Sequence, residues 1–364
     1  MRKSFIVLAL VTLLSGCGKG GQAAAVPVLA PANPEAVTKL AQGVEQAKSK
    51  DGKKQAIELL EKAVAADGQL WEGRYNLGVL LAESGELAAA EKQLAEAQKL
   101  APNAEDVVVA LGEVRRRLGD FDGAADVLSE FVKANPNSTL ARTALVTALR
   151  EAGDIEKAIT EAQNALIRNS NDPYALSELA LAQLERGEID TAELLSKEAL
   201  KATPPRAVAE RTAGLIALKK GDDAVAFHHF QRASELDPED TTARLNIGTV
   251  LLQAGVYDRA ATELKAVVDI DPDDTVATVA LAAALRGKTK RADTGGFAEP
   301  ERLLKSVIER EPKNISALFN LGVLYADYMK RPSDATVMFK RFLSAAPDKH
   351  PARAEAERFL SAKK

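Results

Sequence analysis

The stretch WEGRYNLGVLLAESGELAAAEKQLAEAQKLAPN, residues 71–103, decides the fold. Apolar and small residues recur at helical spacing on both sides of its Glu-Ser-Gly turn, which predicts two amphipathic helices. Gly78 on the first helix allows the second helix to come close, and Ala90 and Ala97 are the small residues on the facing side of that helix. Pro102 ends the second helix and begins the next turn.

Three residue types repeat along the chain every 34 residues, which predicts a stack of similar units. The prolines are Pro102, Pro136, Pro204, Pro238 and Pro272, with Ser170 in the one missing place. The turn glycines are Gly85, Gly119, Gly153, Gly187, Gly221 and Gly255, and the alanines are Ala90, Ala124, Ala158, Ala192, Ala226 and Ala260. A helix pair cannot cover its own apolar face, so each pair buries that face against the next.

The unit resembles the tetratricopeptide repeat, whose Leu-Gly signature occurs as Leu77-Gly78, Leu111-Gly112, Ile247-Gly248 and Leu321-Gly322, with the variant Ala213-Gly214. The resemblance implies an all-α fold, a right-handed superhelical solenoid of antiparallel helix pairs with a concave groove. Full repeats are predicted to begin near Trp71, Glu105, Thr139, Pro173, Ala207, Thr241, Thr275 and Ile315.

The solenoid is predicted to span residues 35–348, with eight full repeats after a degenerate N-terminal unit that has Gly43-Val44 in place of Leu-Gly. Pro272 and Pro312 are 40 residues apart, which predicts a longer turn at 287–299 between the helices of one repeat. The last unit has one extra residue near Lys330-Arg331-Pro332. Residues 349–364 are predicted to form a charged C-terminal capping helix.

The N-terminus, MRKSFIVLALVTLLSGC, has two basic residues before an apolar run that is too short to span a bilayer, as in a secretory signal peptide. Leu14-Ser15-Gly16-Cys17 resembles the lipobox of bacterial lipoproteins. That resemblance implies a signal peptide at 1–16 and an acyl (palmitate) anchor on Cys17; the alternative is an ordinary signal peptide that contains a cysteine. Residues 17–34, rich in Gly, Ala and Pro, are predicted to be a flexible tether.

Gly18 stands where lipoproteins kept at the inner membrane usually have Asp, so the resemblance implies a lipid-anchored protein of the outer membrane that faces the periplasm. Removal of residues 1–16 takes away Arg2 and Lys3, which changes the charge from −4 to −6 (46 basic against 52 acidic residues). An acidic chain of this kind is not expected to bind nucleic acid.

The sequence offers no pattern typical of an enzyme. His228 and His229 are adjacent, so on a helix they point about 100° apart and cannot chelate one ion from one face. No zinc-protease motif, nucleophile elbow or phosphate-binding loop occurs. We therefore expect no catalytic activity, no cofactor, no metal and no small-molecule substrate.

In the tetratricopeptide family the groove is lined by positions 2, 5, 9, 12 and 13 of each first helix. Carried over residue by residue, the resemblance implies a partner-binding groove that includes Tyr75, Val79, Arg116, Arg117, Arg150, Tyr174, Leu181, Leu184, Arg211, Leu215, Leu218, Leu245, Leu252 and Phe319. The alternative for about half of the leucines is packing between helices. An apolar groove with scattered arginines suits an amphipathic helix or an extended peptide with acidic flanks.

The sequence does not fit the mode by which some tetratricopeptide domains bind C-terminal carboxylates. Family members that bind C-terminal carboxylates use a lysine and two asparagines, but Tyr75, Leu245 and Phe319 stand where the lysine would be. The leading hypothesis is a membrane-anchored scaffold that binds envelope proteins and assists a multiprotein machine, similar in plan to type IV pilus pilotins and to gliding-motility lipoproteins. The alternatives are a regulator that docks a cell-wall synthase or hydrolase, and an enzyme or ligand-binding protein whose site lies in the superhelix.

Overall fold

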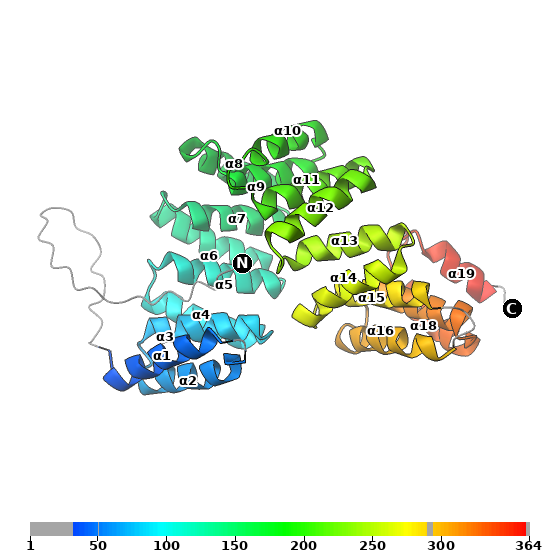
Figure 1. The fold of residues 1–364 in the computed structure, drawn as a ribbon, viewed down its shortest axis with the longest axis horizontal. Coiled ribbons are helices and arrows are strands. Elements are labelled where there is room, and N and C mark those ends of the chain that lie inside the picture. Colours follow the sequence, from blue (N-terminus) through cyan, green and yellow to red (C-terminus); the bar gives the residue numbers. More distant parts are fainter. Residues whose placement is uncertain (1–31, 50, 290–293, 362–364) are drawn as a thin grey trace, which may run out of the picture. The chain divides into compact units, whose positions relative to one another are not determined.

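The computed structural model describes residues 32–49, 51–289 and 294–361. These residues form nineteen α-helices and no β-strand (Figure 1). Consecutive helices pack in pairs, which confirms the predicted all-α solenoid. The chain divides after Pro204 into an N-terminal unit and a C-terminal unit. The predicted signal peptide, Cys17 and the tether up to residue 31 lie outside the described residues.

The N-terminal unit contains five helix pairs. Its helices are α1 (Pro34–Ala47), α2 (Lys53–Ala66), α3 (Trp71–Glu83), α4 (Leu87–Leu100), α5 (Glu105–Arg117), α6 (Phe121–Ala134), α7 (Thr139–Glu151), α8 (Ile155–Arg168), α9 (Pro173–Glu185) and α10 (Ile189–Ala199). Each helix packs on the next along the chain, and first helices of neighbouring repeats also touch, as α5 touches α7 and α7 touches α9.

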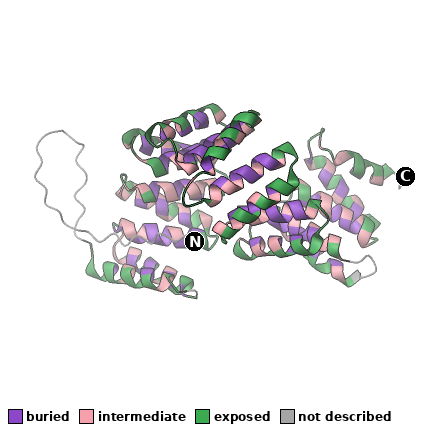
Figure 2. Cartoon of the chain, turned by 45° about the horizontal axis from the view of Figure 1, so that its top comes forward, coloured by how far each residue is buried: buried purple, intermediate pink, exposed green. Residues whose placement is uncertain are grey.

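The C-terminal unit continues the alternation and ends on a single helix. Its helices are α11 (Ala207–Lys220), α12 (Asp223–Leu236), α13 (Thr241–Gln253), α14 (Tyr257–Ile270), α15 (Thr275–Lys288), α16 (Ala298–Arg310), α17 (Ile315–Val323), α18 (Pro332–Ala345) and α19 (Arg353–Ser361), with a 3-10 turn η1 (Thr294–Phe297) and a π-helical turn η2 (Leu324–Tyr328). In both units the helices bury one side and expose the other (Figure 2).

All eight full repeats begin at the residues that the periodicity predicts, from Trp71 on α3 to Ile315 on α17. Side-chain caps fix many of these starts. The capping residues, which accept a backbone N–H bond of the first helical turn, are Asn33, Ser138, Asp172, Asp240, Asp274 and Asn314. Such a cap stabilises a helix by about 1 kcal/mol. The six turn glycines have φ between 73° and 91°, a conformation that other residues adopt only at a cost.

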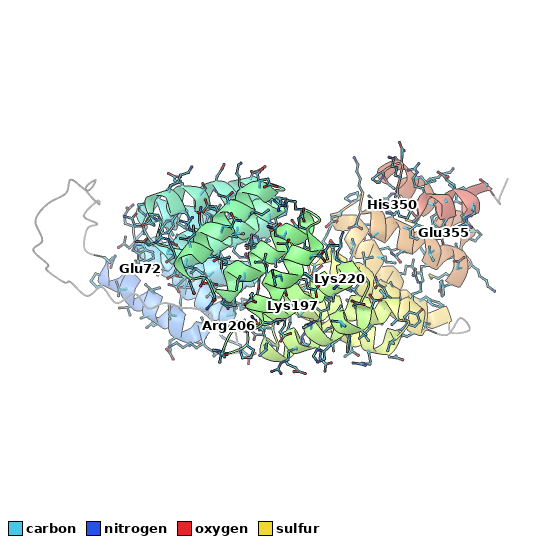
Figure 3. The ribbon with its side chains drawn as sticks, turned by 90° about the horizontal axis from the view of Figure 1, so that it is seen from above. Glu72, Lys197, Arg206, Lys220, His350 and Glu355 are labelled. Carbon is cyan, nitrogen blue, oxygen red and sulfur yellow. The ribbon has the colours of Figure 1, made fainter. Side chains whose placement is uncertain are left out.

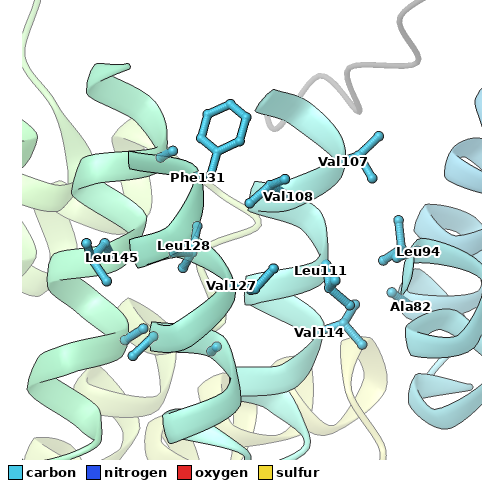
Figure 4. Packing of buried hydrophobic residues seen from close by; sticks show 14 of the residues in the cluster. Ala82, Leu94, Val107, Val108, Leu111, Val114, Val127, Leu128, Phe131 and Leu145 are labelled. Carbon is cyan, nitrogen blue, oxygen red and sulfur yellow. The ribbon is translucent and has the colours of Figure 1, made fainter. Parts of the chain in front are cut away.

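A glycine on the first helix faces a large side chain on the second. A Cβ built on Gly78 would lie 2.6 Å from Cγ of Leu94, and one built on Gly214 would lie 2.6 Å from Cε1 of Phe230. Both large side chains are fully buried. Figure 4 shows this layer of the N-terminal unit, with Leu94 of α4 and Leu128 of α6 on either side of α5. Because glycine has no side chain, the large side chain of the second helix fits against the backbone of the first helix at this position.

Two central repeats fill the same contact in another way. The α7–α8 pair has Val146 and Ala162 at the glycine and leucine positions, and the α9–α10 pair has Ala180 and Ser196. All four are buried. A larger residue on the first helix thus accompanies a smaller one on the second, which keeps the filled volume similar.

The two departures from the 34-residue period are absorbed differently. The six extra residues lie between α15 and α16, where η1 begins at Thr294 and Phe297 is fully buried. The single extra residue is taken up inside the helix, because the N–H of Met329 bonds to the carbonyl of Leu324 five residues earlier. Phe297 of η1 then packs edge-on against Tyr328 of η2, with ring centroids 5.4 Å apart.

The boundary between the units coincides with the shortest second helix of a full repeat. Helix α10 has 11 residues where α2, α4, α6, α8, α12 and α14 each have 14. The repeat that follows still begins on the 34-residue grid, at Ala207, so the connection at 200–206 is longer by the residues that the helix lacks. Separate buried clusters form the two cores, one up to Ala182 and the other from Ala217 onward.

Candidate partner-binding face

The candidate face is defined as positions 2, 5, 9, 12 and 13 of each first helix, counted from the helix starts. In the N-terminal unit it begins with Tyr75 and Val79 on α3. Tyr75 is only 8 % exposed, and burial, with the nearby charge of Asp106, raises the pKa of its hydroxyl to about 12. Val79 is half-buried and packs on the core. Both side chains therefore contribute more to packing than to an open surface.

Arginines and glutamates join successive first helices, mostly near the C-terminal ends of these helices. Arg116 on α5 donates from Nε to Oε2 of Glu151 on α7 at 2.6 Å, and from Nη2 to the other oxygen of the same carboxylate. Arg150 on α7 bonds Glu178 on α9 at 3.3 Å and Glu185 on α9 at 2.5 Å. We call these five residues the ion-pair ladder.

The ladder neutralises the arginines that the sequence placed in the groove. Burial lowers the pKa of Arg116 and of Arg150, but bonds and attraction to their glutamates outweigh burial, and both pKa values are raised. Arg117, which is exposed, donates at 2.8 Å to the carbonyl of Ala82. Arg116 and Arg150 are thus already paired with carboxylates inside the protein. The expected attraction for acidic flanks of a partner loses its main support in this unit.

Near the N-terminal ends of two adjacent first helices, the face exposes apolar side chains. Tyr174 on α9 is 47 % exposed, and Leu140 on α7, at the same repeat position, is 53 % exposed. Leu184 is half-buried, whereas Leu181 is 8 % exposed. A substitution of Leu181 would therefore test packing, and Tyr174 is the better probe of binding.

In the C-terminal unit the predicted residues are mostly half-buried. Arg211 on α11 pairs with Asp240, whose other oxygen caps α13 through the N–H of Ala243 at 3.0 Å. Leu215, Leu218, Leu245 and Leu252 pack partly on the core. Phe319 stacks at 5.1 Å from Phe342 and 6.0 Å from Phe339. Whether these residues also contact a partner stays a prediction.

The groove residues predicted from the sequence do not include several residues that lie on or next to the candidate face. Leu140 and Arg286 follow from the same counting rule applied at Thr139 and Thr275. Glu185 could have been found as the acidic residue 35 positions after Arg150, the spacing that also separates Glu151 from Arg116. Glu178 has no comparable signal, because it lies on the buried side of α9 and reaches Arg150 only through the packing of the two helices.

The described residues contain no group of three or more His, Cys, Asp or Glu side chains that could hold a metal ion. His229 Nδ1 lies 2.8 Å from Glu210, which explains one histidine as a structural contact between α12 and α11. Within 32–49, 51–289 and 294–361, none of the helices is both long and apolar enough to cross a membrane. Figure 3 shows the described side chains of both units, with His350 and Glu355 labelled in the C-terminal part of the chain.

Two family models, both described as tetratricopeptide repeat, match the chain. One matches residues 40–105, 109–172 and 143–207, and the other matches 215–285. The chain therefore belongs to the tetratricopeptide repeat family, whose members are generally scaffolds that bind other proteins. No curated protein matches its sequence significantly.

Solved structures with the same fold are distant in sequence. The Cut9–Hcn1 hetero-tetramer of the APC/C has a TM-score of 0.60 at 13 % identity over 85 % of this chain and 60 % of that one, so the chain spans less than two thirds of that protein. A monomeric IFIT1 mutant with m7Gppp-AAAA has a TM-score of 0.60 at 13 % identity, over 90 % and 82 %. Pseudomonas aeruginosa pilF, at 18 % identity over 59 % and 95 %, has a TM-score of 0.45, too low to support an argument. These likenesses show the fold alone.

Proposed function

We propose that this protein is a scaffold that binds a protein partner through the candidate face of its N-terminal unit. The observation that carries the proposal is the pair of exposed apolar side chains, Leu140 and Tyr174, on adjacent first helices. On α9, Tyr174 is four residues before Glu178, and the arginines of the ion-pair ladder are already paired with glutamates. Tyrosine is one of the residues most enriched among the hot spots of protein interfaces, so Tyr174 is the stronger candidate anchor of the two.

The partner that fits this surface is an amphipathic helix or an extended peptide with an apolar anchor. Burying exposed apolar surface stabilises a complex by roughly 25 cal/mol per Å². The ladder arginines need no acid from outside, so apolar contact supplies the affinity in this unit.

The proposed location and cellular role of the scaffold rest on the sequence. An acyl group on Cys17 would hold the scaffold at the outer membrane, facing the periplasm, with the segment 17–34 as a tether. There it would assist a multiprotein envelope machine for pilus assembly, secretion or gliding motility. The second candidate is a regulator that docks a cell-wall synthase or hydrolase.

Photo-crosslinking in living cells tests the proposal. A crosslinking amino acid is placed at Leu140 or at Tyr174, and in a matched control at Ile167, which is 82 % exposed but lies on the second helix α8. The expected result is capture of a discrete protein from the first two positions and not from Ile167. Equal capture from all three positions, or capture from none, would refute the proposed face. A captured pilus or secretion protein favours the first candidate, and a cell-wall enzyme favours the second.

A further inference from the structure

Three first helices of the chain carry an arginine at position 12: Arg116 on α5, Arg150 on α7 and Arg286 on α15. The first two bind a glutamate at position 13 of the next first helix, Glu151 and Glu185. The corresponding acid for Arg286 is Asp327, counted from the start of α17 at Ile315. Among the described residues, however, no carboxylate lies within 4.0 Å of Arg286, and Asp327 is exposed.

The π-helical turn explains the missing pair. Asp327 belongs to η2, where the extra residue changes the direction in which the following side chains leave the helix. The side chain next to Arg286 is instead Tyr328, with its ring centroid 5.6 Å from the guanidinium carbon. Arg286 is half-buried, and burial lowers its pKa. Electrostatic interactions with Tyr328, Asp327, Tyr257 and Glu355 only partly oppose this.

The hydrogen bonds of Arg286 leave one edge of its guanidinium open. Nη1 donates to the side-chain Oδ1 of Asn320 at 3.2 Å and to its carbonyl at 3.5 Å. Nε and Nη2 bond to no described residue, and the side chain of Arg286 is half-buried and not fully enclosed. In Arg116 these same two nitrogens hold the two oxygens of Glu151.

We propose that the open Nε–Nη2 edge of Arg286 is a receptor for one carboxylate of a partner protein, an Asp or Glu side chain that takes the place of the missing ladder glutamate. An arginine fork of this geometry binds a carboxylate through two parallel bonds. The inference rests on the proposed scaffold function and adds a second, acid-specific contact in the C-terminal unit. It differs from the lysine–asparagine clamp, since Arg286 occupies position 12.

The pairing of Arg116 and Arg150 with glutamates indicates that the ligand of Arg286 is a carboxylate. Arg116 and Arg150 lie at the same repeat position and bind glutamate side chains, so the surroundings of this position accept a planar carboxylate. Around Arg286 the neighbouring groups are an amide, Asn320, and an aromatic ring, Tyr328, neither of which neutralises the charge. A partner carboxylate would supply that missing charge.

Acetate, phosphate and chloride are the probes for the first test, at constant ionic strength. The full chain is labelled with ¹⁵N, and the Nε–H signal of Arg286 is followed during titration. The expected result is a saturable shift with acetate, larger than with chloride, that is weaker in Asn320→Asp, where an internal carboxylate beside Nη1 offsets part of the arginine's charge. Asp293 lies outside the described residues, and Asp293→Asn is the control for an internal carboxylate there; this variant should leave the shift unchanged. A stronger response to phosphate than to acetate, no saturable shift, or a shift that appears only in Asp293→Asn would overturn the carboxylate assignment.

Stability and capture give two further readouts. Arg286→Met should leave the urea midpoint unchanged or raise it, because an unpaired charge leaves a half-buried site, whereas Arg150→Met should lower it by stranding Glu178 and Glu185. A loss with Arg286→Met as large as with Arg150→Met would make Arg286 a structural residue and overturn the inference.

Arg286→Met should also weaken binding of the crosslinked partner about tenfold or more. Undiminished binding would overturn the inference while leaving the scaffold function intact. Absence of any partner with the wild-type chain would instead contradict the proposed function.

Discussion

At the scale of single residues, packing between paired helices depends on a size exchange that the sequence shows only in part. The sequence indicates that Gly78 permits a close approach, with Ala90 and Ala97 opposite. Both alanines are fully buried, but the atom nearest to a Cβ on Gly78 belongs to Leu94, which points into the space above the glycine. A side chain's direction depends on both helices together, so periodicity alone does not give the partner.

The exchange of residue size between the two helices predicts that the effects of substitutions at Gly78 and Leu94 on the free energy of unfolding are strongly coupled. Gly78→Val alone should cost about 1–3 kcal/mol by overpacking, and Leu94→Ala alone about 2–5 kcal/mol by leaving a cavity. The double variant reproduces the natural Val146–Ala162 combination, so its loss should fall short of the sum by more than about 1 kcal/mol. Urea unfolding of the four proteins measures this coupling, and additive losses would show that the two sites pack independently.

At the scale of elements, the turns between paired helices follow the sequence closely except where the period changes. All eight first helices start where predicted, because Pro, Asp and Ser mark the turns and Gly supplies the positive φ. The sequence indicates one extra residue near Lys330-Arg331-Pro332, and η2 absorbs it within the helix. Sequence spacing counts residues and cannot distinguish a longer loop from a π-helical turn.

Lys330 should be an unfavourable residue for its turn. Its φ is 52°, and it is the one residue other than glycine with positive φ in the described ranges, where six repeats use glycine. Lys330→Gly should raise the free energy of unfolding by about 0.5–1 kcal/mol. Gly153→Ala, at a turn with open space around the missing Cβ, should lower it by a similar amount. Thermal melting of both variants tests the pair, and no gain with Lys330→Gly would argue against backbone strain at this turn.

At the scale of the whole molecule, the chain has two cores where its unbroken period predicts one stack. The 34-residue spacing continues through Pro204, so it gives no sign of a boundary there. The boundary does coincide with Pro205 and with the short helix α10. The length of a helix depends on how far its tertiary contacts extend, and the spacing of the repeats does not give that information.

Residues 32–204 and 205–361 should each fold alone, because each has its own buried cluster. Circular dichroism of the two fragments should show a helical spectrum and a cooperative melt for both. A fragment that is unfolded at room temperature would mean that its core depends on the other unit.

Membrane attachment is a property of the complete chain that rests on one residue. Cys17→Ala should yield a protein that fractionates as soluble or stays at the inner membrane as an uncleaved precursor, since no acyl group can be added. Fractionation and labelling with a palmitate analogue provide the measurement. Normal arrival of the variant at the outer membrane would rule out the lipobox interpretation.

The most direct test of the scaffold function compares the affinity of the crosslinked partner for Tyr174→Ala and for Ile167→Ala. Both residues are exposed and apolar, but only Tyr174 belongs to the candidate face. We expect Tyr174→Ala to weaken binding by about 1–2 kcal/mol, roughly 5- to 30-fold, with an unchanged melting temperature, whereas Ile167→Ala should change neither. Equal affinity of the two variants would contradict the proposed scaffold function.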